Sequence, residues 1–252
     1  MNFIPDITFL SQTNPILYKN NILNLIMILD SHIILRKLIG DLQKDTITTL
    51  FGPPGCGKST MCFELANQAL RHGKKVIYID TEGGFSPERL QQINPQIELK
   101  DIIVFSPKTF EEQHSLIRNL SKQIKSANHV GLVLIDSLVM LYRLKLGDAP
   151  QKINSDLGEQ LRMLTEISRT FHIPIFVTNQ MYTTFDTKEN KMVGGMVIEY
   201  WSKTIIEMDK QGHDKKLVLK KHKFKQGGQE ILYDIDNTGL VENKGRGFSF
   251  FK

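Results

Sequence analysis

Eight consecutive residues, Gly52–Ser59 (GPPGCGKS), have the types and spacing that binding of a nucleoside triphosphate requires. They match the pattern G-x-x-x-x-G-K-S/T completely, and the alternative is a glycine turn that only starts a helix. The glycines let consecutive backbone N–H groups converge on phosphate oxygens, and the helix start adds its positive end. We expect Lys58 to reach the β- and γ-phosphates of ATP and the Ser59 hydroxyl to ligate Mg²⁺. The predicted cofactor-binding residues are Gly52, Pro53, Pro54, Gly55, Cys56, Gly57, Lys58, Ser59 and Thr60.

Two carboxylates follow apolar strand-like runs. Asp136 ends the run LVLID, where a carboxylate can hold Mg²⁺ through water opposite Ser59. An aspartate that caps the turn with Ser137 fits almost as well in isolation. Glu82 follows the run that ends at Asp80, where a carboxylate can face the γ-phosphate and polarise the attacking water. Many carboxylates at strand ends are simply solvated, so position alone leaves the role of Glu82 open.

Strands that alternate with helices are expected to position these residues. Val130–Asp136 (VGLVLID) is nearly all apolar, as a strand buried on both faces of a parallel sheet must be. The alternation implies right-handed βαβ crossovers and a mostly parallel sheet flanked by helices. The predicted strands cover residues 46–51, 75–80, 102–105, 130–136 and 174–178, and the predicted helices 58–72, 109–127 and 153–171.

The pattern changes after Gln180. Residues 181–195 are polar, contain glycine and follow no period, so we expect a mobile functional loop. Short strand-like runs then predict an antiparallel meander at the edge of the sheet. The fold class is therefore α/β, with a P-loop core over residues 45–252 and a short N-terminal extension over 1–44. The runs of the meander cover 202–208, 216–220 and 230–235.

Composition restricts the class of protein and its location. The 252 residues are 40% hydrophobic and 23% charged, which is ordinary for a globular chain. The two cysteines, Cys56 and Cys62, suit a reducing compartment and exclude a cysteine zinc site. Charged residues interrupt the apolar stretch 16–39 and no signal peptide is recognisable, so we expect a cytoplasmic protein without a membrane partner. A net charge of +5 permits a polyanion partner without demanding one.

Five motifs, in order and at similar spacing, resemble the core series of the RecA/RadA recombinase family. The resemblance spans about residues 45–240 and implies a RecA-like P-loop ATPase core. Within the family the chain looks most like the archaeal RadB group, the short paralogues of RadA. The reasons are its GPPG opening, the segment 200–203 (YWSK) and the absence of a large N-terminal domain. The motifs are GPPGCGKS (52–59), YIDTEG with SPERL (78–83 and 86–90), LVLIDS (132–137), VTNQ (177–180) and VGG (193–195).

The resemblance implies roles that spacing leaves open. Glu82 matches the family's catalytic glutamate, and Gln180 matches the glutamine that senses the γ-phosphate and signals to the following loop. With Lys58, these are the predicted catalytic residues. The segment 181–195 corresponds to the second DNA-binding loop, and residues near 142–155 correspond to the first. Lys221 and Lys223 fall near the positions of paired basic residues that, in some relatives, reach the ATP of a neighbouring subunit. This role requires self-association.

Both loops carry side chains suited to DNA, which we expect to be single-stranded. Basic side chains can contact phosphates and aromatic ones can stack on bases. The alternative is that loops are polar everywhere, and the acidic residues among them dilute the charge. The run 220–225 (KKHKFK) predicts contact with DNA or an adjacent ATP, with a solvated strand edge as the alternative. The candidates are Tyr142, Arg143, Lys145, Tyr182, Lys188 and Lys191, with Phe185 as a further stacking side chain.

The chain departs from full recombinases in its N-terminal region. Some 44 residues precede the first core strand, where recombinases carry a helical DNA-binding domain and a polymerisation motif, Phe-x-x-Ala. Phe63–Ala66 (FELA) matches that motif but lies in the P-loop helix, where we expect core side chains. Filament formation and strand exchange are therefore not expected. Because the stretch from Met27 resembles a RadB start, we expect residues 1–26 to be a lineage-specific, disordered tail or not native.

Cys56 replaces the smaller polar residues that are usual at its place in the motif. A helix N-terminus can lower the pKa of a nearby thiol. We therefore expect Cys56 to be alkylated in a reaction that ATP blocks.

These residues favour one function and leave two others open. The leading hypothesis is an ATP- and DNA-binding accessory protein of homologous recombination and DNA repair. It is expected to be a weak or DNA-modulated ATPase with ATP and Mg²⁺ as cofactors. The second is a non-catalytic mediator that binds a RadA-type recombinase or a DNA polymerase. The third is a KaiC-like signalling ATPase with no DNA role, against which the lysine run and the VGG loop argue.

Overall fold

The computed structural model describes residues 33–147, 149–183, 190–211 and 214–243. The strands in this part of the chain are β1 (Ile47–Gly52), β2 (Lys75–Asp80), β3 (Ile102–Phe105), β4 (Val130–Asp136), β5 (Ile175–Thr183), β6 (Asn190–Met192), β7 (Thr204–Gln211), β8 (Asp214–Lys221), β9 (Glu230–Asp236) and β10 (Gly239–Glu242). The helices are α3 (Ile33–Ile39), α4 (Lys58–Arg71), α5 (Pro87–Ile93), the 3-10 turn η1 (Leu99–Asp101), α6 (Phe110–Ala127), α7 (Met140–Lys145), α8 (Pro150–Phe171) and α9 (Gly195–Trp201).

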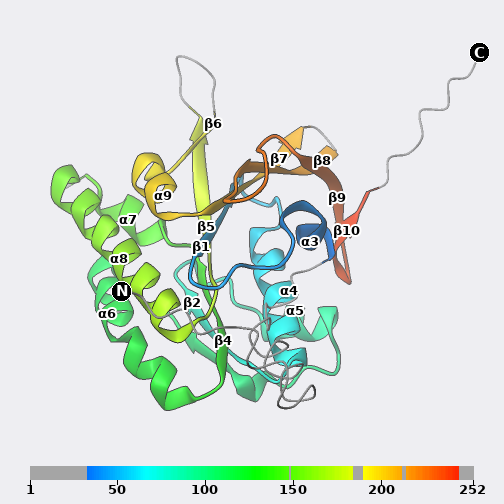
Figure 1. Ribbon diagram of the computed structural model, residues 1–252, viewed down its shortest axis with the longest axis horizontal. Coiled ribbons are helices and arrows are strands. Elements are labelled where there is room, and N and C mark those ends of the chain that lie inside the picture. Colours follow the sequence, from blue (N-terminus) through cyan, green and yellow to red (C-terminus); the bar gives the residue numbers. More distant parts are fainter. Residues whose placement is uncertain (1–32, 148, 184–189, 212–213, 244–252) are drawn as a thin grey trace, which may run out of the picture.

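The strands form a 10-stranded sheet in the order β10-β9-β8-β7-β1-β5-β4-β2-β3, with β6 paired to β5. Every pair from β7 to β3 is parallel, and the pairs from β7 to β10 are antiparallel. Figure 1 shows α4 and α5 on one side of this sheet and α6 and α8 on the other. The predicted α/β fold with a mostly parallel sheet is confirmed.

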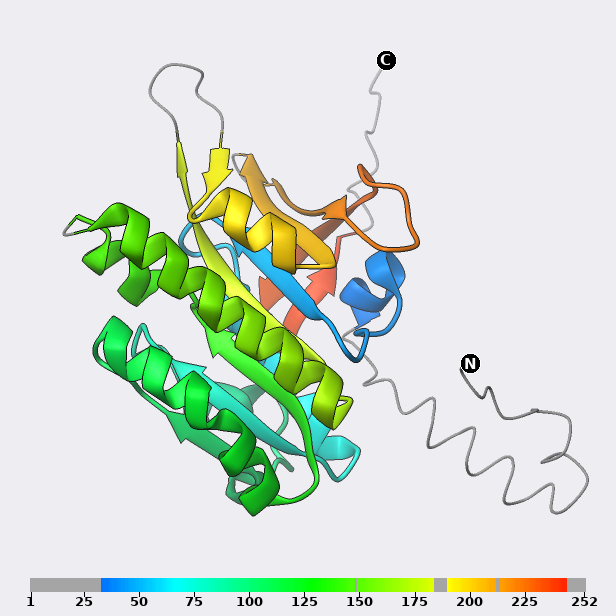
Figure 2. The ribbon, with the colours of Figure 1, turned by 60° about the vertical axis from the view of Figure 1, so that its left-hand side comes forward.

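Both faces of the central strands are buried. All of β1 is buried, and β4 is buried after its first residue. One apolar core lies under α4 and contains Leu50, Leu65 and Phe176, and the other lies under α6 and α8 and contains Ile135 and Leu161. Figure 2 shows α6 and α8 crossing the second face. A strand with a core on either side must be apolar at every position, which explains the continuous runs in the sequence.

Side-chain caps set the starts of two surface helices. The Thr109 side chain accepts a hydrogen bond from the Glu112 N–H at 3.1 Å, so α6 begins at the next residue. Ser86 accepts from the Arg89 N–H at 3.1 Å, and Pro87 follows it at the first helical position of α5. None of the described helices is long and apolar enough to cross a membrane.

The strand predicted at 202–208 begins the antiparallel meander, as expected, but it also joins the parallel part of the sheet. The observed strand, β7, runs parallel to β1, with Thr49 beside Ile205. The preceding helix α9 returns the chain across the face covered by α8, which is the crossover that a parallel neighbour needs (Figure 1). On its other side β7 pairs antiparallel with β8, so the predicted meander is confirmed, and β10 is a further strand of it.

The segment 181–195 is more ordered than an unpatterned loop. Strand β5 continues to Thr183, β6 pairs with it antiparallel, and Met181 lies opposite Met192. Both figures show this hairpin projecting beyond the rest of the sheet (Figures 1 and 2). A projecting hairpin has little core to face, so its sequence lacks the apolar alternation that indicates a strand. Its tip, which includes Phe185 and Lys188, lies outside the described residues.

The region expected to match the first DNA-binding loop, 142–155, is mostly helical. Helix α7 ends at Lys145, and α8 begins at Pro150, three positions before the predicted start. Proline is favoured at the first helical position because its missing N–H has no partner there in any helix. Only a short connection between the two helices remains for a loop.

Part of the predicted N-terminal extension packs on the core. The apolar side chains of α3 contact β8, β9 and β10, and Figure 1 shows the helix beside these strands. Ile34, Leu35, Leu38 and Leu42 are fully or almost fully buried. Lys37 also pairs with Glu242 of β10. Residues 1–32, including Met27, lie outside the described residues.

Candidate nucleotide-binding site

The P-loop lies where the sequence predicts it, between the end of β1 and the start of α4. Gly52 could not carry a side chain, because a Cβ there would lie 2.4 Å from the backbone oxygen of Met208. Gly57 precedes α4 with a left-handed φ of 106°, and no side chain caps the helix N-terminus. The first N–H groups of α4 are therefore available to an anion, which fits a bound phosphate chain.

Lys58 lies across its own loop. Its Nζ donates hydrogen bonds to the backbone oxygens of Gly52 at 3.0 Å and Pro53 at 2.9 Å. Ser59 and Thr60 are half-buried beside it. A lysine held on the loop by two neutral carbonyls can exchange them for phosphate oxygens, with which it forms stronger charge-assisted bonds.

Asp136 ends β4 directly beside Asp80 at the end of β2. It is buried, and its two oxygens accept hydrogen bonds from the hydroxyls of Tyr78, at 3.0 Å, and Thr178. Each oxygen keeps a second lone pair that could accept from a magnesium-bound water, and the role of Asp136 in holding Mg²⁺ stays a prediction. The described residues contain no group of three acidic, histidine or cysteine side chains that could hold a metal alone. Phosphate oxygens would therefore have to complete the coordination, which fits a magnesium ion bound with ATP.

Glu82 and Gln180, 98 positions apart, meet at this edge of the sheet. Gln180 Nε2 donates to Glu82 Oε1 at 2.8 Å, and Ser137 Oγ donates to the same oxygen at 2.6 Å. Gln180 pairs in register with Gly52, the first residue of the P-loop. Its Oε1 is buried and finds no hydrogen-bond partner among the described residues. A glutamine so placed lies between the P-loop and the carboxylate.

Asp80 holds Glu82 in place, and sequence reasoning missed it. Its Oδ1 accepts from the N–H groups of Glu82, Gly83 and Gly84 at 2.8 to 3.2 Å, and its Oδ2 accepts from Phe85 N–H at 3.0 Å. These bonds fold the chain tightly around the carboxylate just after β2. The signal was present, because an aspartate before a glycine-containing turn commonly accepts hydrogen bonds from the backbone ahead of it.

The prediction of a reactive Cys56 is wrong. Its side chain is completely buried, and burial raises the pKa of its thiol above the usual value despite the neighbouring Lys58. Cys62 is buried as well. A buried neutral thiol is a poor nucleophile, so the position of Cys56 near a helix N-terminus does not activate it.

The base of the hairpin is joined to the candidate site. The Gln180 backbone oxygen accepts from Val193 N–H at 3.0 Å. The buried Asn179 side chain donates from Nδ2 to the Val193 oxygen, also at 3.0 Å. Asn179 and Gln180, which lie in β5 next to the P-loop, therefore fix the position of Val193 and, with it, the start of α9.

A cavity of about 1290 Å³ opens beside this hairpin, between α7, α9 and β8. Of the predicted DNA-binding residues, Arg143, Tyr182 and Lys191 line it with exposed side chains. Tyr142 also lines it, but its ring is buried and its hydroxyl donates to Asn154, so it is not free to stack on a base. The prediction for Tyr142 is therefore wrong.

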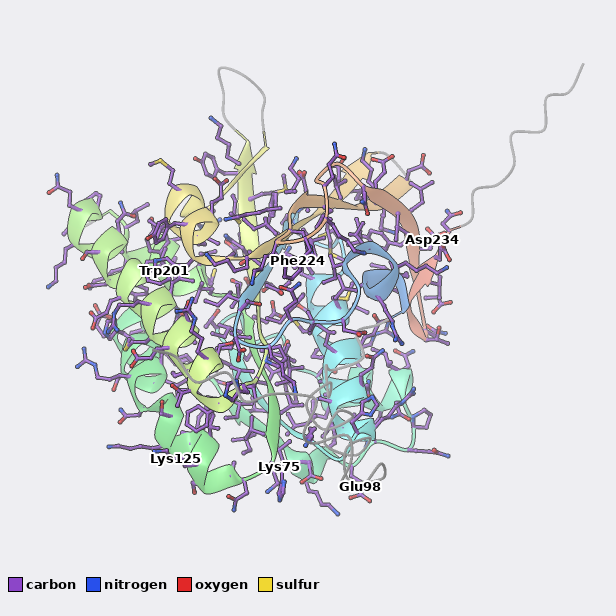
Figure 3. All side chains as sticks on the ribbon, viewed as in Figure 1. Lys75, Glu98, Lys125, Trp201, Phe224 and Asp234 are labelled. Carbon is purple, nitrogen blue, oxygen red and sulfur yellow. The ribbon has the colours of Figure 1, made fainter. Side chains whose placement is uncertain are left out.

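The remaining basic candidates occupy different surroundings. Lys145 is ion-paired with Glu111 at 3.3 Å. Lys221 lines the cavity and donates to the backbone oxygen of Glu199, whereas Lys223 lies 5.0 Å from the centre of the Phe224 ring. Figure 3 places Phe224 on the connection between β8 and β9. The expected reach of Lys221 and Lys223 to a neighbouring subunit stays a prediction.

Comparison with known proteins agrees with this geometry. A family model described as Rad51 matches residues 22–243. The chain belongs to the Rad51 family. Its RecA-like fold and the resemblance to RadB proteins are thereby confirmed.

The similar proteins match about four fifths of this chain and more than nine tenths of their own length. The chain is 39% identical over 215 residues to a protein of Methanosphaera stadtmanae named DNA repair and recombination protein RadB. This match covers 82% of this chain and 92% of the relative. A protein of the same name from Methanocaldococcus jannaschii is 36% identical and covers 81% of this chain and 96% of the relative. A solved structure titled "Crystal structure of the RadB recombinase" superposes with a TM-score of 0.70 at 31% identity, covering 84% of this chain and 97% of that one.

Proposed function

We propose that this Rad51-family protein binds ATP with Mg²⁺ at the P-loop and that the bound nucleotide controls its affinity for single-stranded DNA. Its role is that of an accessory protein in homologous recombination and DNA repair, as the names of its relatives suggest. ATP turnover is slow and serves as a switch. The observation that carries the proposal is the hydrogen bond between Gln180 and Glu82, on the strand that continues into the hairpin.

The nucleotide part of the proposal assigns each group a task. The N–H groups of the P-loop and the first turn of α4 bind the phosphates, and Lys58 neutralises their charge. Ser59 and Asp136 hold Mg²⁺, which when bound draws electron density from the terminal phosphate. Glu82 accepts a proton from the attacking water, while Ser137 keeps its carboxylate turned toward the site.

The DNA part rests on the cavity beside the hairpin. Arg143, Lys191 and Lys220 supply positive charge on its walls, and Tyr182 and Tyr200 are exposed aromatic rings. Stacking on a ring stabilises each unpaired base by roughly 1–3 kcal/mol, which favours single strands over a closed duplex. Glu199 and Glu207 line the same cavity, so the charge there is mixed.

The link between the two parts is Gln180. Its side chain contacts Glu82, and its backbone holds Val193 at the base of the hairpin. A γ-phosphate oxygen can accept a hydrogen bond only from Gln180 Nε2, which here donates to Glu82, so a bound γ-phosphate would compete for this donor and pull on the same residue. We therefore expect nucleotide to change the position of the hairpin relative to α9.

The test compares Lys58→Ala with Lys125→Ala. Lys125 is the matched control, since it lies near the end of α6, just before β4 begins, at the opposite edge of the sheet (Figure 3). Binding of a labelled single strand is titrated with and without Mg·ATP at several salt concentrations. We expect ATP to tighten DNA binding in wild type and Lys125→Ala but not in Lys58→Ala, whose ATP affinity falls roughly 10- to 100-fold.

Three outcomes would contradict the proposal. Unchanged ATP affinity in Lys58→Ala would exclude the P-loop as the nucleotide-binding site. DNA affinity that does not fall with rising salt would exclude contacts to the DNA phosphates and favour a signalling ATPase. Nucleotide binding with neither turnover nor DNA response would favour a non-catalytic mediator.

A further inference from the structure

Strand β9 packs directly against the back of the P-loop. Alternate residues of a strand face the same side, and here Ile231, Tyr233 and Ile235 face inward while their neighbours are exposed. Tyr233 is completely buried. A Cβ on Gly57 would lie 2.7 Å from Ile235 Cδ1, so β9 leaves no room between itself and the loop.

The Tyr233 hydroxyl donates a hydrogen bond of 2.6 Å to the backbone oxygen of Cys56. Burial raises the pKa of Tyr233 well above its usual value, so the hydroxyl stays protonated and remains a donor. Cys56 itself is fixed by burial, with its sulfur 3.7 Å from that of Met208. The carbonyl of the peptide that joins Cys56 to Gly57 is therefore held toward the sheet.

A held carbonyl also fixes the N–H of the same peptide. The C=O and N–H of a trans peptide are coplanar and point in opposite directions, so the Gly57 N–H points away from β9, toward the open side of the loop. Glycine at Gly57 has no Cβ to restrict its rotation. Without the hydrogen bond from Tyr233, the Cys56–Gly57 peptide can rotate, and its N–H then no longer points to the open side of the loop.

We propose that Tyr233 is a positioning residue of the nucleotide site, whose hydroxyl keeps the Gly57 N–H directed at the phosphates. The inference rests on the proposed nucleotide binding and adds a residue that no P-loop motif contains. Tyr233 touches neither nucleotide nor metal, and it acts through the Cys56–Gly57 peptide alone. Its removal should therefore weaken binding of the phosphates more than it weakens the fold.

The experiment compares Tyr233→Phe with Ser168→Ala. The control also removes a buried hydroxyl that donates to a backbone oxygen, that of Ile173 at 2.7 Å, but near the end of α8 and far from the P-loop. Nucleotide affinity is measured with Mg·ADP and Mg·ATP, and unfolding with urea. We expect Tyr233→Phe to bind both nucleotides roughly three- to tenfold more weakly, with KM raised and kcat unchanged. Ser168→Ala should lose similar stability and bind nucleotide like wild type.

Amide hydrogen exchange without nucleotide separates this inference from the proposed function. Tyr233→Phe should speed exchange just after the P-loop at Met61, whose N–H donates to the Gly57 oxygen at 2.9 Å, and leave α6 unchanged. If wild type binds no nucleotide, the proposed function fails, and the exchange result still decides whether Tyr233 holds the loop. Unchanged exchange at Met61, or nucleotide affinity equal to that of wild type, would overturn the inference.

Discussion

At the residue scale, three elements hold Glu82 in place, two of them through one oxygen of its carboxylate. Glu82 Oε1 accepts from Ser137 after β4 and from Gln180 in β5, while Asp80 of β2 folds the backbone beneath it. Glu82 is still exposed to solvent. An exposed carboxylate held at one oxygen keeps the other available to a water molecule, which is what a general base requires.

Replacement of this carboxylate should affect turnover rather than binding. Glu82→Gln keeps an oxygen that can accept the two hydrogen bonds but is a far weaker base. We expect single-turnover ATP hydrolysis to slow roughly 10²- to 10⁴-fold, with ATP affinity within about threefold of wild type. The control is Glu88→Gln, an exposed glutamate in the first turn of α5 whose carboxylate accepts from Ser86. Equal rates in the two variants would exclude Glu82 as the base.

At the scale of elements, the hairpin and α9 depend on the carboxyl end of β5. Asn179 is fully buried and donates to Val193, and Gln180 accepts from the same residue. The end of the strand next to the P-loop therefore also positions the wall of the cavity. Two hydrogen bonds of 3.0 Å therefore join the end of β5 to the start of α9.

Loss of the Asn179 side chain should loosen this connection. Asn179→Ala leaves the buried Val193 oxygen without its donor, which costs about 1–3 kcal/mol of unfolding free energy. We expect the variant to retain ATP binding but to lose the effect of ATP on DNA affinity. Urea unfolding and DNA titration are the measurements. Asn119→Ala, which removes an exposed amide bonded to Ser115 on α6, should change neither. An ATP effect on DNA that persists in Asn179→Ala would show that the hairpin is controlled elsewhere.

At the scale of the whole molecule, the C-terminal strands close over the P-loop helix. Glu64 of α4 accepts a hydrogen bond from the Leu240 N–H of β10, and a Cβ on Gly239 would collide with its carboxyl group. Burial is the main reason why the pKa of Glu64 is raised to about 8. This carboxyl group is therefore mostly protonated in the folded protein at neutral pH.

The raised pKa of Glu64 predicts how the free energy of unfolding changes with pH. Between the ordinary glutamate pKa of 4.5 and about 8, the unfolded chain releases the Glu64 proton while the folded protein retains it. The stabilisation present below that window is therefore lost as pH rises through it. We expect Glu64→Gln, which cannot ionise, to gain on the order of 3 kcal/mol relative to wild type between pH 5 and pH 8.

Urea unfolding at a series of pH values checks this prediction. The matched control is Glu166→Gln, because Glu166 is an exposed glutamate paired with Arg162 on the surface of α8. That variant should follow the wild-type curve. A Glu64→Gln curve parallel to wild type would mean that Glu64 titrates normally in the folded protein.

The sequence by itself determined the place of the P-loop motif and the parallel core. Gly52–Ser59 is a contiguous motif, and a strand buried on both faces must be apolar at every position, so both features can be recognised locally. The hairpin after Gln180 was missed because it projects from the core and bears no apolar alternation. Tyr142 was misjudged because residue type does not reveal burial.

Only the tertiary structure decided which side chains support the site. Cys56 and Tyr233 are 177 positions apart, and Glu64 and Leu240 are 176 apart, so no local pattern could join them. Their contact depends on the return of β7 beside β1, which brings β9 and β10 over α4. That burial also raised the pKa of the Cys56 thiol, which a helix N-terminus alone would lower. Sequence indicates which groups can do chemistry, and packing sets their orientation and their charge.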